Sequence, residues 1–207
     1  MARYVSPLRE AQAAQTRQRV LDAAVATFRS SGYSGSSLAR IAEDAGVSVE
    51  TVKQLGPKSS LLLAAFGHAF TGVDTDLPLS EQSGLDWIRA LPDDEFIPGW
   101  LGFIADANRR VAQLWPRLLE AASADEEVGT RLATLQANRR KDMDSVISAL
   151  RERGLCRSER TDAELAAELS FLISPESYSQ LVIEGGWSEQ AYRSWLGRAV
   201  ERMILQP

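Results

Sequence analysis

The apolar residues of this chain recur at a helical spacing over nearly its whole length. Where an apolar stripe is present, its members stand three or four residues apart, which places them on one face of an α-helix. No segment shows the sustained alternation of apolar and polar residues that is typical of a half-buried strand. The pattern therefore predicts an all-α fold.

Glycine, proline and capping residues divide this pattern into separate helices. Gly32, Gly46 and Gly154 are placed to end helices, and Thr161 and Glu164 have the spacing of a capping box. The expected helical segments are residues 15–30, 37–45, a turn or two after 48, 57–73, 85–91, 98–114, 116–122, 125–153, 161–185 with an interruption at Pro175, and 188–204. Residues 74–83, rich in Asp, Pro and Ser, are expected to form a linker or a corner.

The short helices of the first 60 residues differ from the longer ones that follow. The second and third are separated by a corner that contains Gly46, as in a helix-turn-helix. We therefore expect an N-terminal three-helix helix-turn-helix domain of residues 1–60 and a larger C-terminal helical domain of residues 61–207.

The charge of the chain is unevenly distributed. The formal net charge of all 207 residues is −5, but residues 1–60 contain eight Lys or Arg and five Asp or Glu. A basic N-terminal domain would attract a polyanion while the acidic remainder would repel it, although exposed charges often serve only solvation.

Several classes of protein are disfavoured by the composition. No apolar run approaches the roughly 18 residues of a membrane span, and the N-terminus lacks the apolar core of a secretory signal. Cys156 is the sole cysteine and cannot form an internal disulfide. These features lead us to expect a soluble, cytoplasmic protein that does not associate with a membrane.

The third predicted helix is short and polar, which makes it a candidate for reading a DNA groove. Val47, Val52 and Leu55 can anchor it to the preceding helices. Its other side chains can contact base edges or phosphates: threonine suits a thymine methyl, glutamate accepts from cytosine, glutamine pairs with adenine, and lysine donates to guanine or phosphate.

Residues 17–66 resemble the DNA-binding head of the TetR (tetracycline-repressor) family of transcriptional regulators. The resemblance rests on Ala23-Ala24, Phe28, Gly32-Tyr33, Ser36-Ser37, Ile41-Ala42, Ala45-Gly46-Val47-Ser48, Thr51-Val52, Lys58 and Leu61-Leu62. It implies that the third helix reads bases, that a hydroxyl at the start of the second helix contacts phosphate, and that a lysine after the third helix does the same. The implied DNA-contacting residues are Ser36, Ser37, Ser48, Val49, Glu50, Thr51, Lys53, Gln54 and Lys58.

The chain departs from the family pattern after the Thr51-Val52 pair. The family usually has an aromatic residue there, often tyrosine, and then a pair such as His-Phe before its lysine. Here residues 53–58 contain neither, and the run is one residue shorter. The tyrosine-to-phosphate contact is therefore absent, and Lys53 is the expected substitute.

The resemblance also implies that the remainder of the chain binds a small effector. Such pockets are mostly apolar with a few directing polar groups, and the same residues are equally suited to an ordinary helical core. The candidate ligand-binding residues are Trp100, Phe103, Ile104, Asn108, Trp115, Leu119, Leu135, Asn138, Arg139, Met143, Phe171 and Tyr178.

A homodimer is implied as well, since the last two helices of each subunit form a four-helix interface in the family. The candidate interface residues are Leu165, Leu169, Leu172, Leu181, Tyr192, Trp195, Leu196, Ala199, Val200 and Met203. The same stripe suits an internal core. A dimer would read a palindromic double-stranded DNA operator, with half-sites about one turn apart.

Two other classes of function are weighed against a ligand-responsive regulator. A small helical enzyme has little support, because His68 is the sole histidine, Cys156 has no recognisable nucleophile context, and no phosphate-binding glycine loop occurs. We expect no metal and no cofactor. A helical adaptor that has lost DNA binding is the second alternative.

Overall fold

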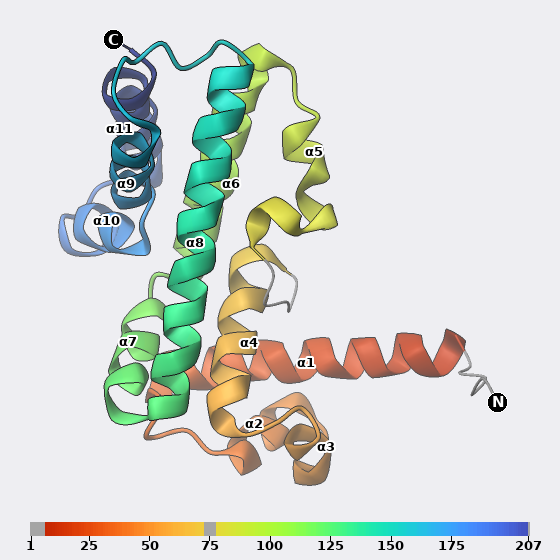
Figure 1. Cartoon of the computed structure of the whole chain (residues 1–207). Coiled ribbons are helices and arrows are strands. Elements are labelled where there is room, and N and C mark those ends of the chain that lie inside the picture. The colour runs from red at the N-terminus through yellow and green to blue at the C-terminus, as the bar shows by residue number, and fades with distance from the viewer. Residues whose placement is uncertain (1–6, 73–77, 207) are drawn as a thin grey trace. The chain divides into compact units, whose positions relative to one another are not determined.

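The computed structural model describes residues 7–72 and 78–206, and the secondary structure of these residues is helical, without a strand (Figure 1). The expected all-α fold is confirmed. The described residues form two compact units, one within Met1–Thr75 and Gln113–Leu132, the other within Asp76–Ala112 and Ala133–Pro207. This division by compactness differs from the functional division expected near residue 60. Residues 74–77 of the expected linker, and residue 73 at the end of the expected fourth helix, lie outside the described residues.

Unit 1 is built from α1 (Pro7–Ser31), α2 (Leu38–Ala45), α3 (Val49–Lys53), α4 (Lys58–Thr71), α7 (Trp115–Ala124) and the first residues of α8 (Glu126–Glu152). Helix α1 packs against both α2 and α4, and α4 also packs against α7. The apolar stripes seen in the sequence form its core, which includes Val20, Ala24, Phe28, Ile41, Val52, Leu61, Leu62, Phe66, Trp115 and Leu118.

Helix α1 begins eight residues earlier than the apolar pattern predicted. Residues 8–19 are exposed, apart from the half-buried Thr16, so they have no apolar stripe to reveal them. Their composition of alanine, glutamine and arginine favours a helix by intrinsic propensity alone. This exposed N-terminal half of α1 continues past the packed part of the helix (Figure 1).

Unit 2 contains two 3₁₀ turns, η1 (Leu79–Glu81) and η2 (Ser83–Leu85), then α5 (Asp86–Arg89), α6 (Asp93–Val111) and the remainder of α8. It ends with α9 (Asp162–Leu172), α10 (Pro175–Tyr178), the π-helical turn η3 (Ser179–Glu184), α11 (Glu189–Val200) and the π-helical turn η4 (Glu201–Leu205). Helix α11 packs against α6 and α9, and α10 packs against α6.

Helix α6 begins at Asp93, although the sequence predicted a start at Pro98. Asp93, Asp94 and Glu95 occupy its first turn, where carboxylates are favoured by the helix dipole. Pro98 lies inside the helix, where its missing N–H removes one hydrogen bond of the ladder. The run of acids, rather than the proline, marks the start of this helix.

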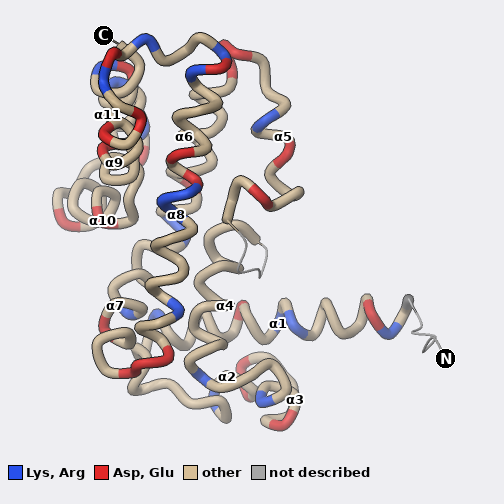
Figure 2. Tube along the Cα trace, viewed as in Figure 1, with Lys and Arg blue, Asp and Glu red and all other residues tan. Residues whose placement is uncertain are grey.

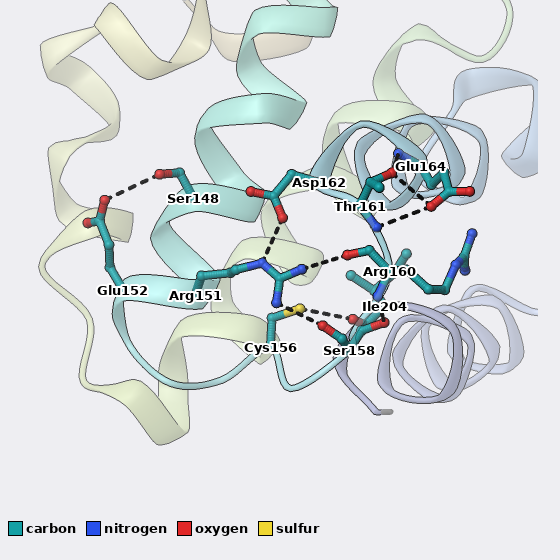
Figure 3. Close-up of polar contacts among 10 residues, drawn as sticks. All are labelled: Ser148, Arg151, Glu152, Cys156, Ser158, Arg160, Thr161, Asp162, Glu164 and Ile204. Carbon is teal, nitrogen blue, oxygen red and sulfur yellow. Dashed lines mark hydrogen bonds and ion pairs between the residues drawn. The ribbon is translucent and has the colours of Figure 1, made fainter.

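The connection between α8 and α9 is organised by one arginine (Figure 3). The Arg151 guanidinium donates to Asp162 Oδ1 at 2.6 Å and to the carbonyls of Ser158 and Arg160, both at 2.8 Å. The predicted capping box is confirmed, because Glu164 N donates to Thr161 Oγ1 while Thr161 N donates to the Glu164 carboxylate.

The end of the chain is attached to the same connection. Arg157 N donates to the Leu205 carbonyl at 2.8 Å. The buried Cys156 thiol donates to the Ile204 carbonyl at 3.2 Å, as Figure 3 shows. The cysteine is therefore a buried structural thiol.

Replacing Arg151 tests this connection. Arg151→Met removes three hydrogen bonds, two of them to loop carbonyls, so we expect the Tm to fall by several degrees. Arg160→Met is the matched control, because its guanidinium pairs only with the Glu168 carboxylate among the described residues. Thermal unfolding followed by circular dichroism measures both, and equal Tm values for the two variants would contradict the organising role of Arg151.

Candidate nucleic-acid interface

Helices α2 and α3 form a helix-turn-helix whose ends are fixed by local hydrogen bonds. Ser37 caps α2, its Oγ accepting from Arg40 N at 3.2 Å, and Ser48 caps α3, its Oγ accepting from Thr51 N at 3.1 Å. Gly46 ends α2 with φ of 64°, in the left-handed region that glycine adopts without strain. The corner between the helices therefore follows directly from Gly46 and Ser48.

Helix α3 turns one apolar residue inward and its polar residues outward. Val52 is completely buried, while Val47 and Leu55 are half-buried. Of the side chains predicted to read DNA, Thr51 is half-buried and its hydroxyl lies 2.8 Å from that of Ser48. Those of Ser48, Val49, Glu50, Lys53 and Gln54 are exposed.

The charges of α2 and α3 pair largely with one another. Arg40 lies 3.4 Å from Glu43 and 3.0 Å from Asp44, and Lys53 Nζ lies 3.8 Å from Glu50. These are exposed pairs, and they leave the two helices without a cationic excess (Figure 2). The surface that would read base edges therefore has little attraction for phosphates.

The expectation for Ser36 is corrected by the structure. Its side chain is only 5% exposed, and its hydroxyl donates to the Gly32 carbonyl at 2.5 Å. This serine stabilises the connection between α1 and α2. Ser37, which is exposed at the start of α2, is the one of the pair that can meet a phosphate.

Lys58 is also engaged inside unit 1. Its ammonium donates to the carbonyls of Tyr33 at 2.9 Å and Ser36 at 3.2 Å, and it lies 4.2 Å from the centre of the Tyr33 ring. Two of its three protons are therefore used within the protein. Lys58, the lysine expected to contact phosphate, therefore already stabilises the start of α4 against the α1–α2 connection.

Tyr33 extends this arrangement to α7 and α8. Its hydroxyl donates to Asp125 Oδ2 at 2.8 Å, between those two helices. Burial, followed by the hydrogen bond to Asp125, raises the pKa of Tyr33 to about 12. The hydrogen bond from Tyr33 and that from Val128 N lower the pKa of Asp125 below its ordinary value.

Helix α4 has two further contacts with the same region. The Ser59 hydroxyl donates to Glu127 Oε2 at 2.8 Å, and the rings of Phe66 and Trp115 lie 5.5 Å apart. Sequence reasoning missed Tyr33, Ser59, Asp125 and Glu127 as partners. The pairs are 92 and 68 residues apart, and no periodic pattern identifies partners at such separations.

Two predicted ligand-binding residues of unit 2, Asn108 and Arg139, donate hydrogen bonds to carbonyls at or near the C-terminal end of α9. Asn108 is completely buried, and its Nδ2 donates to the carbonyls of Ile173 at 2.9 Å and Ser174 at 3.3 Å. Arg139 donates to the Ser170 carbonyl, and burial lowers its pKa. Asn108 Oδ1 is buried without a hydrogen-bond partner among the described residues, which makes it an acceptor available inside the unit.

The other ligand-binding candidates are not all brought together. Trp100, Ile104, Met143 and Tyr178 are buried in unit 2, and Phe103, Leu135 and Asn138 are half-buried there. Trp115 and Leu119 belong to unit 1. Phe171 is 68% exposed, so it does not line an interior.

Most of the candidate dimer residues are part of the core of unit 2. Six are buried within the chain: Leu165, Leu169, Leu172, Tyr192, Leu196 and Val200. Leu181, Trp195 and Ala199 are half-buried, and Met203 is exposed. The apolar stripe of α11 is thus explained mainly by packing against α6 and α9. The large apolar side chains exposed in this part of the chain are Phe171 on α9, Ile183 on η3, Trp187 in the connection between η3 and α11, and Met203 on η4.

The part of the chain that the structure describes gives no support for a metal site or a membrane-spanning helix. It contains no cluster of three or more His, Cys, Asp and Glu side chains arranged to hold a metal ion, and no helix long and apolar enough to cross a bilayer. The sole histidine, His68, has its Nε2 2.7 Å from Asp22 Oδ1 and joins α4 to α1.

Comparisons with known proteins identify the fold. No family model and no curated protein sequence matches the chain. Among solved structures, a proposed TetR-family transcriptional regulator from Rhodococcus sp. matches with a TM-score of 0.70 and 19% identity, covering 93% of this chain and 100% of that one. A proposed transcriptional regulator from Saccharomonospora viridis in complex with choline matches with a TM-score of 0.69 and 19% identity, covering 94% of this chain and 100% of that one. A TetR transcription regulator from Haloarcula marismortui matches with a TM-score of 0.62 and 15% identity, covering 92% of this chain and 99% of that one.

These likenesses define the class of the fold. The chain has the all-helical fold of the TetR-type transcriptional regulators over nearly its entire length. The helix-turn-helix of α2 and α3 lies in the region where the sequence resembles the DNA-binding head of that family.

The hydrogen bond between Tyr33 and Asp125 leads to a prediction about pH. Tyr33→Phe keeps the ring beside Lys58 but removes the hydroxyl, so we expect the Tm near neutral pH to fall by a few degrees. Because the folded pKa of Asp125 lies below its unfolded value of about 3.9, its contribution is present above that pH and is lost as the pH falls through the folded pKa.

The difference in Tm between the two proteins should therefore shrink as the pH is lowered from 6 toward 3. At high pH the raised pKa of Tyr33 acts in the opposite direction, since its contribution is present below about pH 10 and is lost as the pH rises toward 12. Thermal unfolding at a series of pH values checks both the acidic range and the alkaline range. A difference that does not change with pH would show that this hydrogen bond is not the source of the effect.

Proposed function

We propose that the chain is a ligand-responsive transcriptional regulator of the TetR family, a cytoplasmic repressor that binds a palindromic double-stranded DNA operator as a homodimer. The observation that carries the proposal is the pair α2 and α3, in which Ser48 caps a short helix, Val52 anchors it, and Lys53 and Gln54 point outward. The TetR-type fold of the rest of the chain supports it. We propose no enzymatic role.

Dimerisation is proposed through the last helices of unit 2. Phe171, Ile183, Trp187 and Met203 are large apolar side chains that a monomer would leave in water. A second copy that covers them would also place a second α3 on the operator, and two recognition helices on a two-fold axis read a palindrome.

The response to ligand is proposed to start at Asn108. A buried acceptor without a partner costs free energy, and a small, mostly apolar molecule that donates a hydrogen bond would remove that cost. The fold relative from Saccharomonospora viridis holds choline, which supports a small-molecule effector in general without specifying this one.

Release from DNA would follow from the contacts within unit 1. Helix α8 contributes its first residues to unit 1 and the remainder to unit 2, and the former include the partner of Ser59. A change in α8 would therefore act on α4 through Glu127 and on the α1–α2 connection through Asp125 and Tyr33. If the effector favours one conformation of the chain and DNA favours another, the binding of each weakens the binding of the other by a coupling free energy of typically 1–3 kcal/mol.

In vitro selection from random duplex DNA tests the function itself. We expect a palindrome to be enriched, and light scattering to give a protein dimer on it. Lys53→Ala combined with Gln54→Ala should weaken operator binding by about 10- to 100-fold, with a smaller effect on random duplex, since a good base contact contributes about 1–3 kcal/mol.

The matched control for this pair lies on the exposed surface of α8 in unit 2. Lys141→Ala combined with Gln136→Ala makes the same chemical change there, and it should leave operator affinity unaltered. Binding without any sequence preference by the unaltered protein would refute sequence-specific regulation, and the absence of salt-dependent duplex binding would favour the helical adaptor.

The role of Asn108 is tested with effector candidates found by thermal shift. Asn108→Val removes the acceptor, so we expect effector affinity to fall at least tenfold while operator affinity is retained. Ser177→Ala is the control, because the Ser177 hydroxyl also supports the end of α9, through the Leu172 carbonyl at 2.8 Å, without offering that acceptor. An Asn108→Val protein that releases DNA at the original effector concentration would exclude this site.

A further inference from the structure

Helix α3 directs two of its side chains almost straight away from its packed side. Val52 is completely buried and marks that packed side. At roughly 100° per residue, Glu50 and Gln54 both lie about 160° from Val52, one on either side of the outermost line of the helix. They are four residues apart, so they are neighbours on one face, and both are exposed. Glu50 and Gln54 are therefore the outer pair of α3.

The other polar side chains of this helix are less available for reading bases. The hydroxyls of Ser48 and Thr51 lie 2.8 Å apart, and Ser48 Oγ also accepts from Thr51 N. Val49 and Lys53 lie on one flank of the helix, roughly 60° and 100° from the buried Val52. In a groove that held α3, the outer pair would therefore be the side chains best placed to contact base edges.

The outer pair has a distinct hydrogen-bonding chemistry. A carboxylate only accepts, so Glu50 suits the N4 donor of cytosine and repels guanine, which presents the two acceptors O6 and N7. The amide of Gln54 both donates and accepts, which suits N7 and N6 of adenine. Four helical residues rise about 6 Å and successive bases of B-DNA about 3.4 Å, so the two contacts fall within about two base pairs of each other.

The negative charge of Glu50 opposes the binding of DNA in general. Residues 37–54 contain two basic and three acidic side chains, so this acid belongs to a surface that already lacks a cationic excess (Figure 2). Its ion pair with Lys53, at 3.8 Å between exposed groups, offsets little of that repulsion. An acid here lowers affinity for every sequence, but it lowers affinity most for the wrong base, and specificity is such a difference.

The helix dipole offers a simpler explanation of this glutamate. Glu50 lies in the first turn of α3, where a carboxylate is favoured by the positive end of the dipole. A glutamate with that role alone would affect the stability of the helix and leave the choice of base unchanged. Base preference, rather than affinity, therefore separates the two explanations.

We propose that Glu50 is the specificity-determining residue of α3: its carboxylate accepts from cytosine N4 and excludes guanine at that position, while Gln54 pairs with an adenine nearby. This inference rests on the proposed function and names the bases that the operator must present. Each half-site then contains a C·G pair and an A·T pair within about two base pairs of each other.

Selection from random duplex DNA with the full chain tests the inference. We expect Glu50→Gln to return a palindrome in which one C·G pair of each half-site is replaced by A·T or is no longer selected. The ratio of operator affinity to random-duplex affinity should fall roughly 10- to 100-fold. Affinity for random duplex should itself rise a few-fold, because a negative charge is removed beside the phosphates. Gln54→Ala should instead relax an A·T pair within about two base pairs of that C·G pair.

The matched control is Glu43→Gln, which removes the same charge from α2. The Glu43 side chain is 72% exposed, compared with 75% for that of Glu50. This variant should raise affinity for random duplex to a similar extent and still return the original palindrome.

Three results would overturn the inference while leaving the proposed function intact. If Glu50→Gln returns the original palindrome, the glutamate serves the helix dipole alone. If Glu43→Gln changes the palindrome in the same way, the effect belongs to charge and not to a base contact. If the unaltered protein selects a palindrome whose half-sites lack a C·G pair, Glu50 has no cytosine to contact. A protein that selects no sequence at all contradicts the proposed function instead, before any variant is made.

Discussion

The ammonium of Lys58 is the interaction on which the arrangement of unit 1 depends. A half-buried cation needs several acceptors, and here the Tyr33 and Ser36 carbonyls and the Tyr33 ring supply them. Tyr33 in turn donates to Asp125, so a cation, an aromatic ring and a carboxylate join α4, the α1–α2 connection and the start of α8. The orientation of α2 and α3 is thereby tied to residues almost a hundred positions away in the sequence.

The roles of Lys58 and Ser36 in unit 1 follow from these contacts. A lysine that supports the fold cannot also be fully committed to a phosphate, and a serine that is buried cannot meet one at all. Under the proposed function, the reading of bases falls on α3, while Lys58 and Ser36 support the fold around it. The paired charges of α2 and α3 are consistent with such a division, because a surface without excess charge depends on the match of its side chains to base edges for its affinity.

Much of the fold could be predicted from the sequence, because local signals determined it. The apolar periodicity predicted the helices, Gly46 and Ser48 predicted the corner, and Thr161 with Glu164 predicted the start of α9. Prediction failed where a helix buries nothing, as in the first half of α1, and where proline masked an earlier start, as in α6. The resemblance to the TetR head drew attention to α3, but burial distinguished Ser37 from Ser36, and burial is a property of the folded chain. The polar partners of Tyr33 and Ser59 could not be predicted from the sequence because they depend on tertiary contacts.

One aromatic contact gives the molecule an optical property. Of its five tryptophans, only Trp115 belongs to unit 1, where it is buried against Phe66 of α4. The indole fluorescence of that unit therefore comes from a single ring at the junction of α4 and α7. With the other four replaced by phenylalanine, the emission maximum and quenching of the remaining tryptophan would report the packing of α4 directly, without any label.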